Sequence, residues 1–381
     1  MTWTEKLLTE LIALPSVNPA FAAHSGVSTN SSHSVFGEKN VADFLAATAA
    51  TAGLDVEFQA VLPGRANLIA RLRPKNKVKQ TILLAPHLDT VVADEKQFTP
   101  QRKGGRLYGR GACDTKGSVA AMLSALIALA KAKTRPLETE IIFAGLIDEE
   151  NAQAGSRALV KKFKADLAIV GEPTRCQIVT AHKGSLWLRL ETRGRAAHGA
   201  TPHLGKNAVH EMARVVDVLE TAYAAQLRQR KHKLLGTGTV NVGKISGGKQ
   251  PNIVPDQCEI LVDRRTLPGE TEAGVRREII ARLQAKKLSA RITSDKSVPC
   301  LALETDYKRP LVQAFFRSVG QAKPIGVDYF CDAAVLAAGG IPSIVFGPGD
   351  IAQAHTADEW ISLAGLERAQ ALLVKFFNSL P

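Results

Sequence analysis

Paired cysteines are missing from the sequence. Its five cysteines, Cys113, Cys176, Cys258, Cys300 and Cys331, are scattered along the chain, and no two of them form a C-x-x-C motif. This absence argues against a disulfide framework and against a zinc ribbon. Such cysteine usage is typical of reduced thiols, so we expect a cytoplasmic protein.

Long apolar runs are also missing. No apolar stretch approaches the roughly 20 residues that a membrane-spanning helix needs. The segment Met1–Leu8 contains an acidic residue and lacks the basic start of a secretory signal peptide. We therefore expect neither a signal peptide nor a membrane partner.

Aromatic residues make up only 5% of the chain, and this scarcity bears on its positive charge. The 49 basic and 36 acidic residues give a net charge of +13. A strongly basic chain can bind nucleic acid, but here the basic residues are spread over amphipathic segments without interleaved aromatic side chains. We therefore expect no nucleic-acid partner, and attribute the charge to solvated faces or to a mild attraction for small anions.

The order of the expected elements indicates an α/β protein with an insertion. Up to residue 179, buried strands alternate with amphipathic helices, which is the pattern of a largely parallel sheet. A strand is expected over Ile178–Thr192 and a helix from about Asn207 to Leu227. Between 180 and 295 the order becomes βαββαβ, that of a ferredoxin-like sandwich. The α/β pattern resumes from 296 to 381. We predict a discontinuous α/β domain, 1–179 and 296–381, with an inserted α+β domain at 180–295.

Reactive side chains gather where the expected strands end. The apolar run Thr81–Leu84 leads to His87 and Asp89. Because side chains alternate along a strand, these two project from the same face, about 7 Å apart. An imidazole beside a carboxylate suits a metal ligand with its orienting partner. The same pair also occurs in ordinary capped loops, so taken alone it leaves both interpretations open.

A glycine-rich turn, Gly109–Gly117, contains Asp114 and leads directly into an apolar helix. Asp114 could cap that helix, or it could bridge two metal ions. The turn lacks the spacing of a phosphate-binding loop. The local sequence does not separate a cap from a ligand.

Another buried strand, Ile141–Ile147, ends in Asp148, Glu149 and Glu150. An acidic strand end often does no more than face solvent. Adjacent glutamates point in different directions, however, so one of them could hold a metal while the other serves as general base.

Two more positions complete the set. Glu172 follows the strand Asp166–Val170, and His355 follows the strand that ends at Phe346. A single histidine at a strand end is usually structural, but two histidines and several carboxylates at such ends rarely occur together by chance. Mixed nitrogen and oxygen ligands suit zinc, cobalt or manganese rather than a thiolate site.

These segments resemble the acetylornithine deacetylase, succinyl-diaminopimelate desuccinylase and carboxypeptidase G family of dinuclear metallo-amidohydrolases. The resemblance extends over nearly the whole chain, and its motifs are specific in combination. They are His87-Leu88-Asp89, Gly109–Gly117, Asp148-Glu149-Glu150, Gly171-Glu172-Pro173-Thr174, Ala354-His355-Thr356, Ala197-His198-Gly199, Pro251–Pro255 and Asp263-Arg264-Arg265.

The resemblance implies that five side chains hold two divalent metal ions. Zinc is the favoured metal, with cobalt or manganese as alternatives. Asp114 would bridge both ions, often with a cis peptide bond after it. The other implied ligands are His87 and Glu172 at one ion, and Glu150 and His355 at the other.

The resemblance also implies a catalytic metallopeptidase-like domain and an insert that acts as a lid and as the dimerisation domain of a homodimer. Glu149 would be the acid/base, and Asp89 would orient His87. His198 would stabilise the oxyanion in the active site of the partner subunit. Arg265 and Asn252 would bind the α-carboxylate and backbone of the substrate.

Within the family the chain resembles the acetylornithine deacetylases in particular. This resemblance implies hydrolysis of the amide bond of an N-acyl amino acid, here N2-acetylornithine to ornithine and acetate, as in arginine biosynthesis. The alternatives are a succinyl-diaminopimelate desuccinylase, an acetyl-lysine deacetylase, a dipeptidase or carboxypeptidase, and an inactive binding relative. Cys331 stands where the family usually has Thr, and Thr115 stands where Met is commoner. These departures leave open which substrate side chain the site accepts.

Overall fold

The computed structural model describes residues 1–24, 35–132, 135–296 and 298–381. The chain divides into two compact units. Unit 1 consists of Met1–Thr180, Thr305–Ile325 and Cys331–Pro381, and unit 2 of Ala181–Glu304 and Gly326–Phe330. Among the described residues, no helix combines the length and the apolar composition that crossing a membrane requires.

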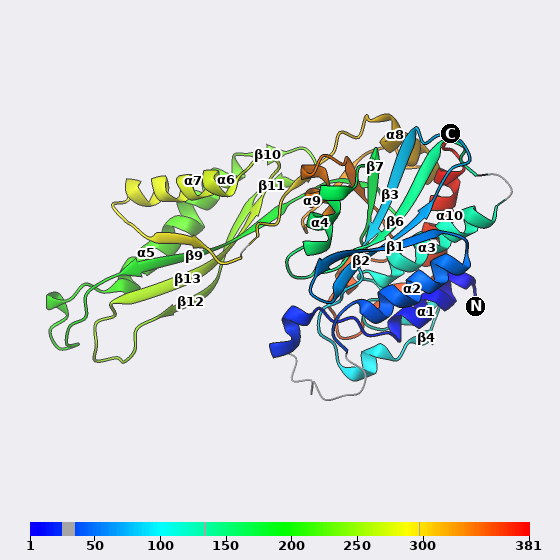
Figure 1. The fold of residues 1–381 in the computed structure, drawn as a ribbon. Helices are drawn as coiled ribbons and strands as arrows, with labels where there is room; N and C mark the ends of the chain where they lie inside the picture. Colours follow the sequence, from blue (N-terminus) through cyan, green and yellow to red (C-terminus); the bar gives the residue numbers. More distant parts are fainter. Residues whose placement is uncertain (25–34, 133–134, 297) are drawn as a thin grey trace. The chain divides into compact units, whose positions relative to one another are not determined.

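Unit 1 is built on a mixed β-sheet (Figure 1). Across the sheet the strands are β1 (Asp55–Leu62), β2 (Arg65–Leu72), β6 (Thr139–Gly145), β3 (Gln80–Pro86), β7 (Leu167–Gly171), β17 (Ser343–Val345) and β8 (Val179–His182). The central pairs β6–β3, β3–β7 and β7–β17 are parallel. The outer pairs β1–β2, β2–β6 and β17–β8 are antiparallel. The predicted α/β class with a largely parallel centre is confirmed.

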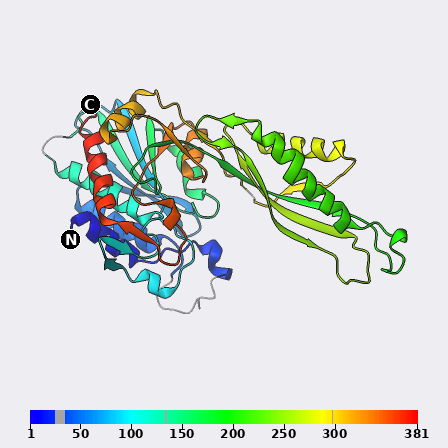
Figure 2. The ribbon, with the colours of Figure 1, turned by 180° about the vertical axis from the view of Figure 1, so that it is seen from behind.

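An apolar helix, α3 (Lys116–Lys131), forms the centre of the core of unit 1. Nearly all of its residues are buried, as expected for a helix that is apolar on all sides. It packs against β3, β6 and β7, and also against two other helices, α1 and α10. In Figure 2 the red helix α10 lies in front of the sheet of unit 1. Besides α3, the α-helices of unit 1 are α1 (Trp3–Ile12), α2 (Lys39–Thr51), α4 (Ala154–Lys162), α8 (Pro310–Val319), α9 (Asp332–Ala338) and α10 (Leu363–Phe377).

A second, small sheet in unit 1 joins two distant parts of the chain. Its strands are β4 (Gln101–Lys103), β5 (Arg106–Tyr108) and β18 (Trp360–Ser362), all antiparallel, with β5 in the middle. The pairing of β5 with β18 brings the turn that begins at Gly109 beside the segment that ends at Glu359. Strands of three residues are too short to show a periodic pattern, so the sequence does not predict this sheet.

Unit 2 contains a four-stranded antiparallel sheet in the order β12-β13-β9-β14. Helices α5 and α7 cover one face, where Leu188, Ile260 and Val262 form a shared core with them. The element order and strand order are those of the predicted ferredoxin-like sandwich. The elements are β9 (Gly184–Arg193), α5 (Ala208–Val218), α6 (Ala224–Arg228), β10 (Lys231–His232), β11 (Gly236–Thr237), β12 (Thr239–Gly247), β13 (Gln257–Thr266), α7 (Glu272–Ala285) and β14 (Arg291–Ser294). Two further short strands, β15 (Leu303–Glu304) and β16 (Ile325–Val327), pair with β8 and belong to the large sheet.

Two sequence-based expectations are wrong in detail. The single strand expected over Ile178–Thr192 is two strands, β8 and β9, which Lys183 separates. The chain changes neighbours there: His182 pairs with Leu303, whereas Ser185 pairs with Arg265. Alternating hydrophobicity continues through such a change, since it reports which face is buried and not which strand lies alongside. The helix expected near 207–227 contains a π-helical turn at Leu219–Tyr223 between α5 and α6.

Candidate metal centre

The carboxyl ends of three parallel strands bring three of the five predicted ligands together, with Glu149 beside them. His87 follows β3, Glu149 and Glu150 follow β6, and Glu172 follows β7. The strand register places Pro86 beside Gly171, and His87 beside Leu146. Side chains that leave a sheet at the same edge converge there, which is the usual location of a site in an α/β sheet.

Asp114 lies between two histidines, one at each carboxylate oxygen. Its Oδ1 is 3.0 Å from Nε2 of His87, and its Oδ2 is 3.3 Å from Nε2 of His355. Nε2 of His87 is 3.9 Å from Oε1 of Glu172, and Nε2 of His355 is 3.3 Å from Oε1 of Glu150. The five side chains thus form two groups that share Asp114, and within each group the ligand atoms lie within 4.8 Å of one another.

The structure decides between the two interpretations of Asp114. Helix α3 begins at Lys116 and Thr115 occupies its N-cap position, with no capping hydrogen bond from a side chain. The carboxylate of Asp114 contacts the two histidines instead. The Asp114–Thr115 peptide bond is cis. Asp114 is therefore not a helix cap, and its two carboxylate oxygens face the two histidines.

The first group is buried, and its electrostatics favour a bound cation. Burial would lower the pKa of His87, but contacts with Asp114 and Asp89 and the charge of Glu172 raise it well above its usual value. Burial raises the pKa of Glu172 well above its ordinary range. Oε1 of Glu172 has no hydrogen-bond partner among the residues that the structure describes. A buried carboxylate without a partner is costly, and a metal ion would satisfy it.

The second group is more open. The side chain of His355 is 53% exposed, and its contacts with Asp114 and Glu150 raise its pKa to about 10. Burial and the charge of Asp114 raise the pKa of Glu150. A divalent cation could replace the proton that these groups otherwise share. The nitrogen and oxygen donors of both groups fit zinc, cobalt or manganese.

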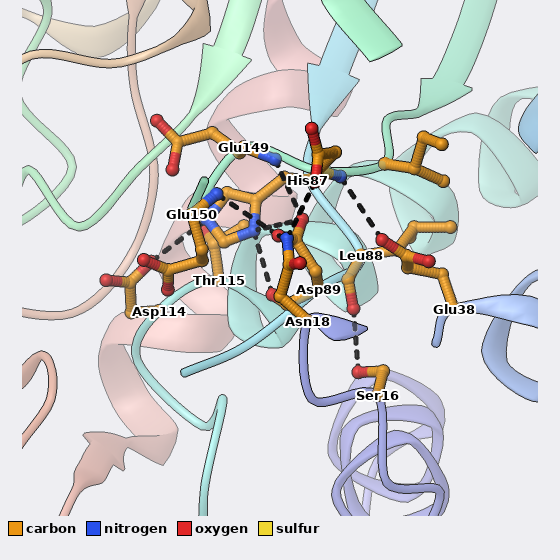
Figure 3. A network of polar contacts seen from close by, with 12 residues as sticks. Ser16, Asn18, Glu38, His87, Leu88, Asp89, Asp114, Thr115, Glu149 and Glu150 are labelled. Carbon is orange, nitrogen blue, oxygen red and sulfur yellow. Dashed lines mark hydrogen bonds and ion pairs between the residues drawn. The ribbon is translucent and has the colours of Figure 1, made fainter. Parts of the chain in front are cut away.

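Glu149 is adjacent to the predicted ligand Glu150, but its side chain points elsewhere. Figure 3 shows its carboxylate directed away from Glu150 and Asp114. Burial raises the pKa of Glu149 well above its usual value; the charge of His87 opposes this shift, and that of Glu172 adds to it. A carboxyl group with a raised pKa beside a metal centre suits general acid–base chemistry.

Asp89 contacts more than the histidine that it was predicted to orient. Nδ1 of His87 is 2.9 Å from the backbone oxygen of Asp89 and 3.6 Å from its carboxylate. The carboxylate accepts hydrogen bonds from the backbone N–H groups of Glu149 and Glu150, at 3.1 Å each, and from Nδ2 of Asn18 at 2.7 Å. Asp89 thus also anchors the turn that carries the two glutamates (Figure 3).

A buried network behind this turn was not found from the sequence. Asn18 donates to Asp148 at 3.1 Å, and Nη1 of Arg65 lies 3.2 Å from the same carboxylate. Arg65 also pairs with Glu38, through Nε at 2.8 Å, and Glu38 accepts from the backbone N–H of Asp148 at 3.2 Å. These residues come from separate segments without a shared motif, so no local signal points to them.

Cys331 and Asp332 lie close to Glu149, the predicted acid/base. Both side chains are buried, and Ser156 donates to Oδ1 of Asp332 at 2.6 Å. Burial raises the pKa of Asp332 to about 6. Burial, and then the charges of Glu172 and Glu149, raise the pKa of the Cys331 thiol. The position where the chain departs from the family therefore borders the site.

In unit 2, the structure brings two of the three predicted residues together. His198 and Asn252 are both exposed, and they lie in adjoining segments, since Gly199 N–H donates to the backbone oxygen of Asn252 at 2.7 Å. Nδ1 of His198 accepts from Ala200 N–H at 3.1 Å.

Arg265 lies elsewhere in unit 2, near the far end of β13. Its Nε donates to Asp263 at 2.9 Å. The ring of Phe330 lies 5.9 Å from the Arg265 guanidinium and 5.4 Å from the Lys296 ammonium. Ten residues of strand span roughly 30 Å, so Arg265 and Asn252 do not form one local site within unit 2.

The chain is similar to known proteins over most of its length. The model of peptidase family M20/M25/M40 matches residues 83–379. The chain is 32% identical over 391 residues to an acetylornithine deacetylase of Proteus mirabilis (strain HI4320), covering 97% of this chain and 94% of that protein. It is 31% identical over 352 residues to an acetylornithine deacetylase of Myxococcus xanthus, covering 87% and 90%.

Solved structures share the fold at lower identity. The aminopeptidase PepT from Bacillus cereus ATCC 10987 has a TM-score of 0.78 at 22% identity, covering 99% of this chain and 97% of that one. An M20 family metallo-carboxypeptidase from Sulfolobus solfataricus has a TM-score of 0.75 at 20% identity, covering 99% of both chains. The YXEP protein of Bacillus subtilis, described as a dinuclear metal-binding M20 peptidase, has a TM-score of 0.67 at 13% identity, covering 98% and 96%.

Proposed function

The chain belongs to peptidase family M20/M25/M40 and is a metal-dependent hydrolase, and from this premise we propose that it hydrolyses the amide bond of an N-acyl amino acid. The favoured substrate is N2-acetylornithine, which gives ornithine and acetate. The observation that carries the proposal is Asp114, whose two carboxylate oxygens face His87 and His355 beside the half-buried Glu149.

His87, Asp114 and Glu172 would hold one divalent metal ion, and Asp114, Glu150 and His355 the other. Zinc is the expected metal, with cobalt or manganese as alternatives. When bound, the two ions supply Lewis-acid polarisation of the acyl carbonyl and make water more acidic. The mixed donor set and the unpartnered Oε1 of Glu172 support this assignment.

Glu149 would move the proton during hydrolysis. Its carboxylate accepts a proton from the attacking water, and the same proton then goes to the amine nitrogen as the carbon–nitrogen bond breaks. Water thus supplies the oxygen of the released carboxylate and the proton of the amine. Asp89 supports this step because it orients His87 and holds the backbone N–H groups of Glu149 and Glu150.

Unit 2 would contribute to binding and to the transition state. We expect Arg265 to bind the α-carboxylate of the substrate and Asn252 its backbone. We expect His198 to stabilise the oxyanion in the active site of the partner subunit of a homodimer. The exposure of His198 supports such a role. The edge strand β12, whose outer side has no partner strand among the described residues, supports pairing of two copies.

The acetyl group and the ornithine side chain rest on the two acetylornithine deacetylases that cover most of the chain. The alternatives are a succinyl-diaminopimelate desuccinylase, an acetyl-lysine deacetylase and a dipeptidase or carboxypeptidase. A different class is a binding relative without activity. Cys331 borders the site, so a change of side-chain preference would begin there.

A substrate panel tests the proposal. Protein loaded separately with zinc, cobalt or manganese is assayed with N2-acetylornithine, N-acetyl-lysine, succinyl-diaminopimelate and dipeptides, and the released amine is measured. We expect kcat/KM for acetylornithine to exceed that for the others by about 10-fold or more, the scale of pocket discrimination. Faster turnover of another compound would reassign the substrate, and no turnover by protein that holds two ions would indicate the inactive relative.

A further inference from the structure

One buried carboxylate beside the metal centre has no place in the reaction described above. Glu359 is 1% exposed and lies four residues after His355, just before β18. It is not among the residues whose donor atoms form the two metal-ligand groups. A buried carboxylate is costly unless its oxygens are paired, so its surroundings indicate what it does.

Both oxygens of Glu359 accept hydrogen bonds from the turn that carries Asp114. Oε2 accepts from Nη1 of Arg110 at 2.7 Å and from Gly111 N–H at 3.0 Å. Oε1 accepts from the backbone N–H groups of Cys113 at 2.8 Å and Asp114 at 2.9 Å. The backbone immediately before the shared ligand is therefore held by a single side chain.

The fold around Glu359 explains this arrangement. β5 ends at Tyr108 and pairs with β18, which begins at Trp360. Gly109 N–H donates to the backbone oxygen of Glu359 at 3.0 Å and continues that pairing by one step. Glu359 consequently connects the turn of Asp114 to the segment of His355, and these two residues belong to the same metal-ligand group.

We propose that Glu359 is a positioning residue that holds Asp114 and His355 at the spacing that the second divalent cation requires. The inference rests on the proposed function only in that it takes the two groups as metal sites. Residues that orient metal ligands through hydrogen bonds commonly change metal affinity by about 10–100-fold when they are replaced. The first cation depends less on Glu359, because His87 and Glu172 follow strands β3 and β7.

The variant Glu359→Gln tests the proposal with metal binding as the readout. Glutamine has one acceptor oxygen and one NH₂ group, so in either orientation two of the four donors lose their acceptor. We expect the affinity for the second Zn²⁺ ion to fall by about 10–100-fold in a chelator competition titration, with a smaller loss at the first ion, which shares Asp114. With Co²⁺, the visible absorption of the second site should saturate at correspondingly higher metal concentration.

Two control variants separate positioning from other effects. Asp358→Asn changes the exposed neighbouring carboxylate in the same loop and should leave both affinities unchanged. Arg110→Lys keeps the opposite charge beside Glu359 and leaves the three backbone N–H contacts in place. It should therefore weaken the second ion less than Glu359→Gln does. Equal losses of affinity in Arg110→Lys and Glu359→Gln would mean that the ion pair, and not the hydrogen bonds to the backbone, holds the site. This result would overturn the proposal.

A second variant and a measurement on the unaltered protein keep the test decisive. Glu359→Asp retains the charge but shortens the side chain, so we expect a loss of second-site affinity in the same direction even if Glu359→Gln does not fold. In the unaltered chain, hydrogen exchange of residues 110–115 should be as slow as in α3. Rapid exchange of this segment, or wild-type affinity for both ions in Glu359→Gln, would overturn the proposal.

The outcomes for this inference and for the proposed function are distinguishable. The metal titration uses no substrate. A chain that binds two ions and hydrolyses none of the panel contradicts the proposed substrate class and leaves the role of Glu359 intact. A Glu359→Gln variant with unchanged metal affinity contradicts only the positioning role. Uptake of fewer than two ions by the unaltered chain would contradict both.

Discussion

Units 1 and 2 place their candidate functional residues in opposite environments. In unit 1, His87, Asp89 and Glu172 are buried and lie within a continuous set of charged contacts. In unit 2, His198 and Asn252 are exposed, and the side chain of Arg265 is 32% exposed beside Asp263. Before a ligand binds, the candidate residues of unit 1 are therefore held in place more firmly than those of unit 2.

This difference follows from the free energy of burying charge. A buried ionised group is retained only when other charges, hydrogen bonds or a metal ion satisfy it, so the centre in unit 1 is preorganised by its own contacts. An exposed side chain keeps its hydration and its rotamer freedom until a ligand orders it. We therefore expect substitutions in unit 1 to abolish metal binding or turnover, and those in unit 2 to weaken substrate binding.

Asp114→Asn gives the largest expected effect, since it removes the ligand that both groups share. Metal uptake should fall from two ions per chain to less than one, and turnover by about 10⁴-fold, because two-metal catalysis supplies several kcal/mol of transition-state stabilisation. Metal analysis and initial rates measure this, with Asp358→Asn as the control. Retention of two tightly bound ions would show that Asp114 is not a ligand.

Glu149→Ala or Glu149→Gln should separate chemistry from metal binding within unit 1. We expect kcat to fall by about 10³-fold while both ions remain bound, because only the proton-transferring group is lost. The exposed Glu95 provides a matched control, Glu95→Gln, which should behave as the unaltered chain does. Near-full activity of the Glu149 variants would rule out this residue as the acid/base.

Acid should destabilise the fold through one buried histidine, His182, at the end of β8. Burial lowers the pKa of His182 to about 4 from an ordinary 6.5. Its Nδ1 lies 2.9 Å from the Lys183 backbone oxygen, and its Nε2 has no partner among the described residues. Between pH 6.5 and 4 the unfolded chain binds a proton at His182 that the folded chain does not, so stability falls with decreasing pH, by about 3 kcal/mol in total.

Urea unfolding at several pH values checks this prediction. The variant His182→Asn keeps a donor for the Lys183 oxygen and cannot titrate, so its unfolding free energy should lose about 3 kcal/mol less over that pH range. The exposed His203 gives the control His203→Asn, whose pH dependence should match that of the unaltered chain. The same slope in all three proteins would contradict the prediction.

Arg265→Met should give the smallest effect. We expect KM for the acyl amino acid to rise by about 10–100-fold with little change in kcat, since a hydrogen bond to a charged group contributes about 1.5–3 kcal/mol to binding. Arg291→Met, at an exposed position on β14, is the control. A loss confined to kcat would place Arg265 in the transition state and would remove the distinction between the two units.

The site could be predicted from the sequence as far as its chemistry is local. Apolar runs that end in His87, Glu150 and Glu172 show both that strands are buried and where they end, and strand ends in parallel sheets meet at one edge. The α/β class and the ferredoxin-like order of the insert follow from the same local periodicity. These features depend on residues that are near one another in the chain.

The tertiary structure alone decided which partner each carboxylate takes. Asp114 could be a cap or a ligand until His87 and His355 were placed at its two oxygens. The Oδ2 of Asp89 accepts the N–H group of a residue 61 positions away, and Glu359 holds that of Asp114 across 245 positions. Such contacts leave no periodic trace, because a hydrogen bond depends on distance in space and not on separation along the chain.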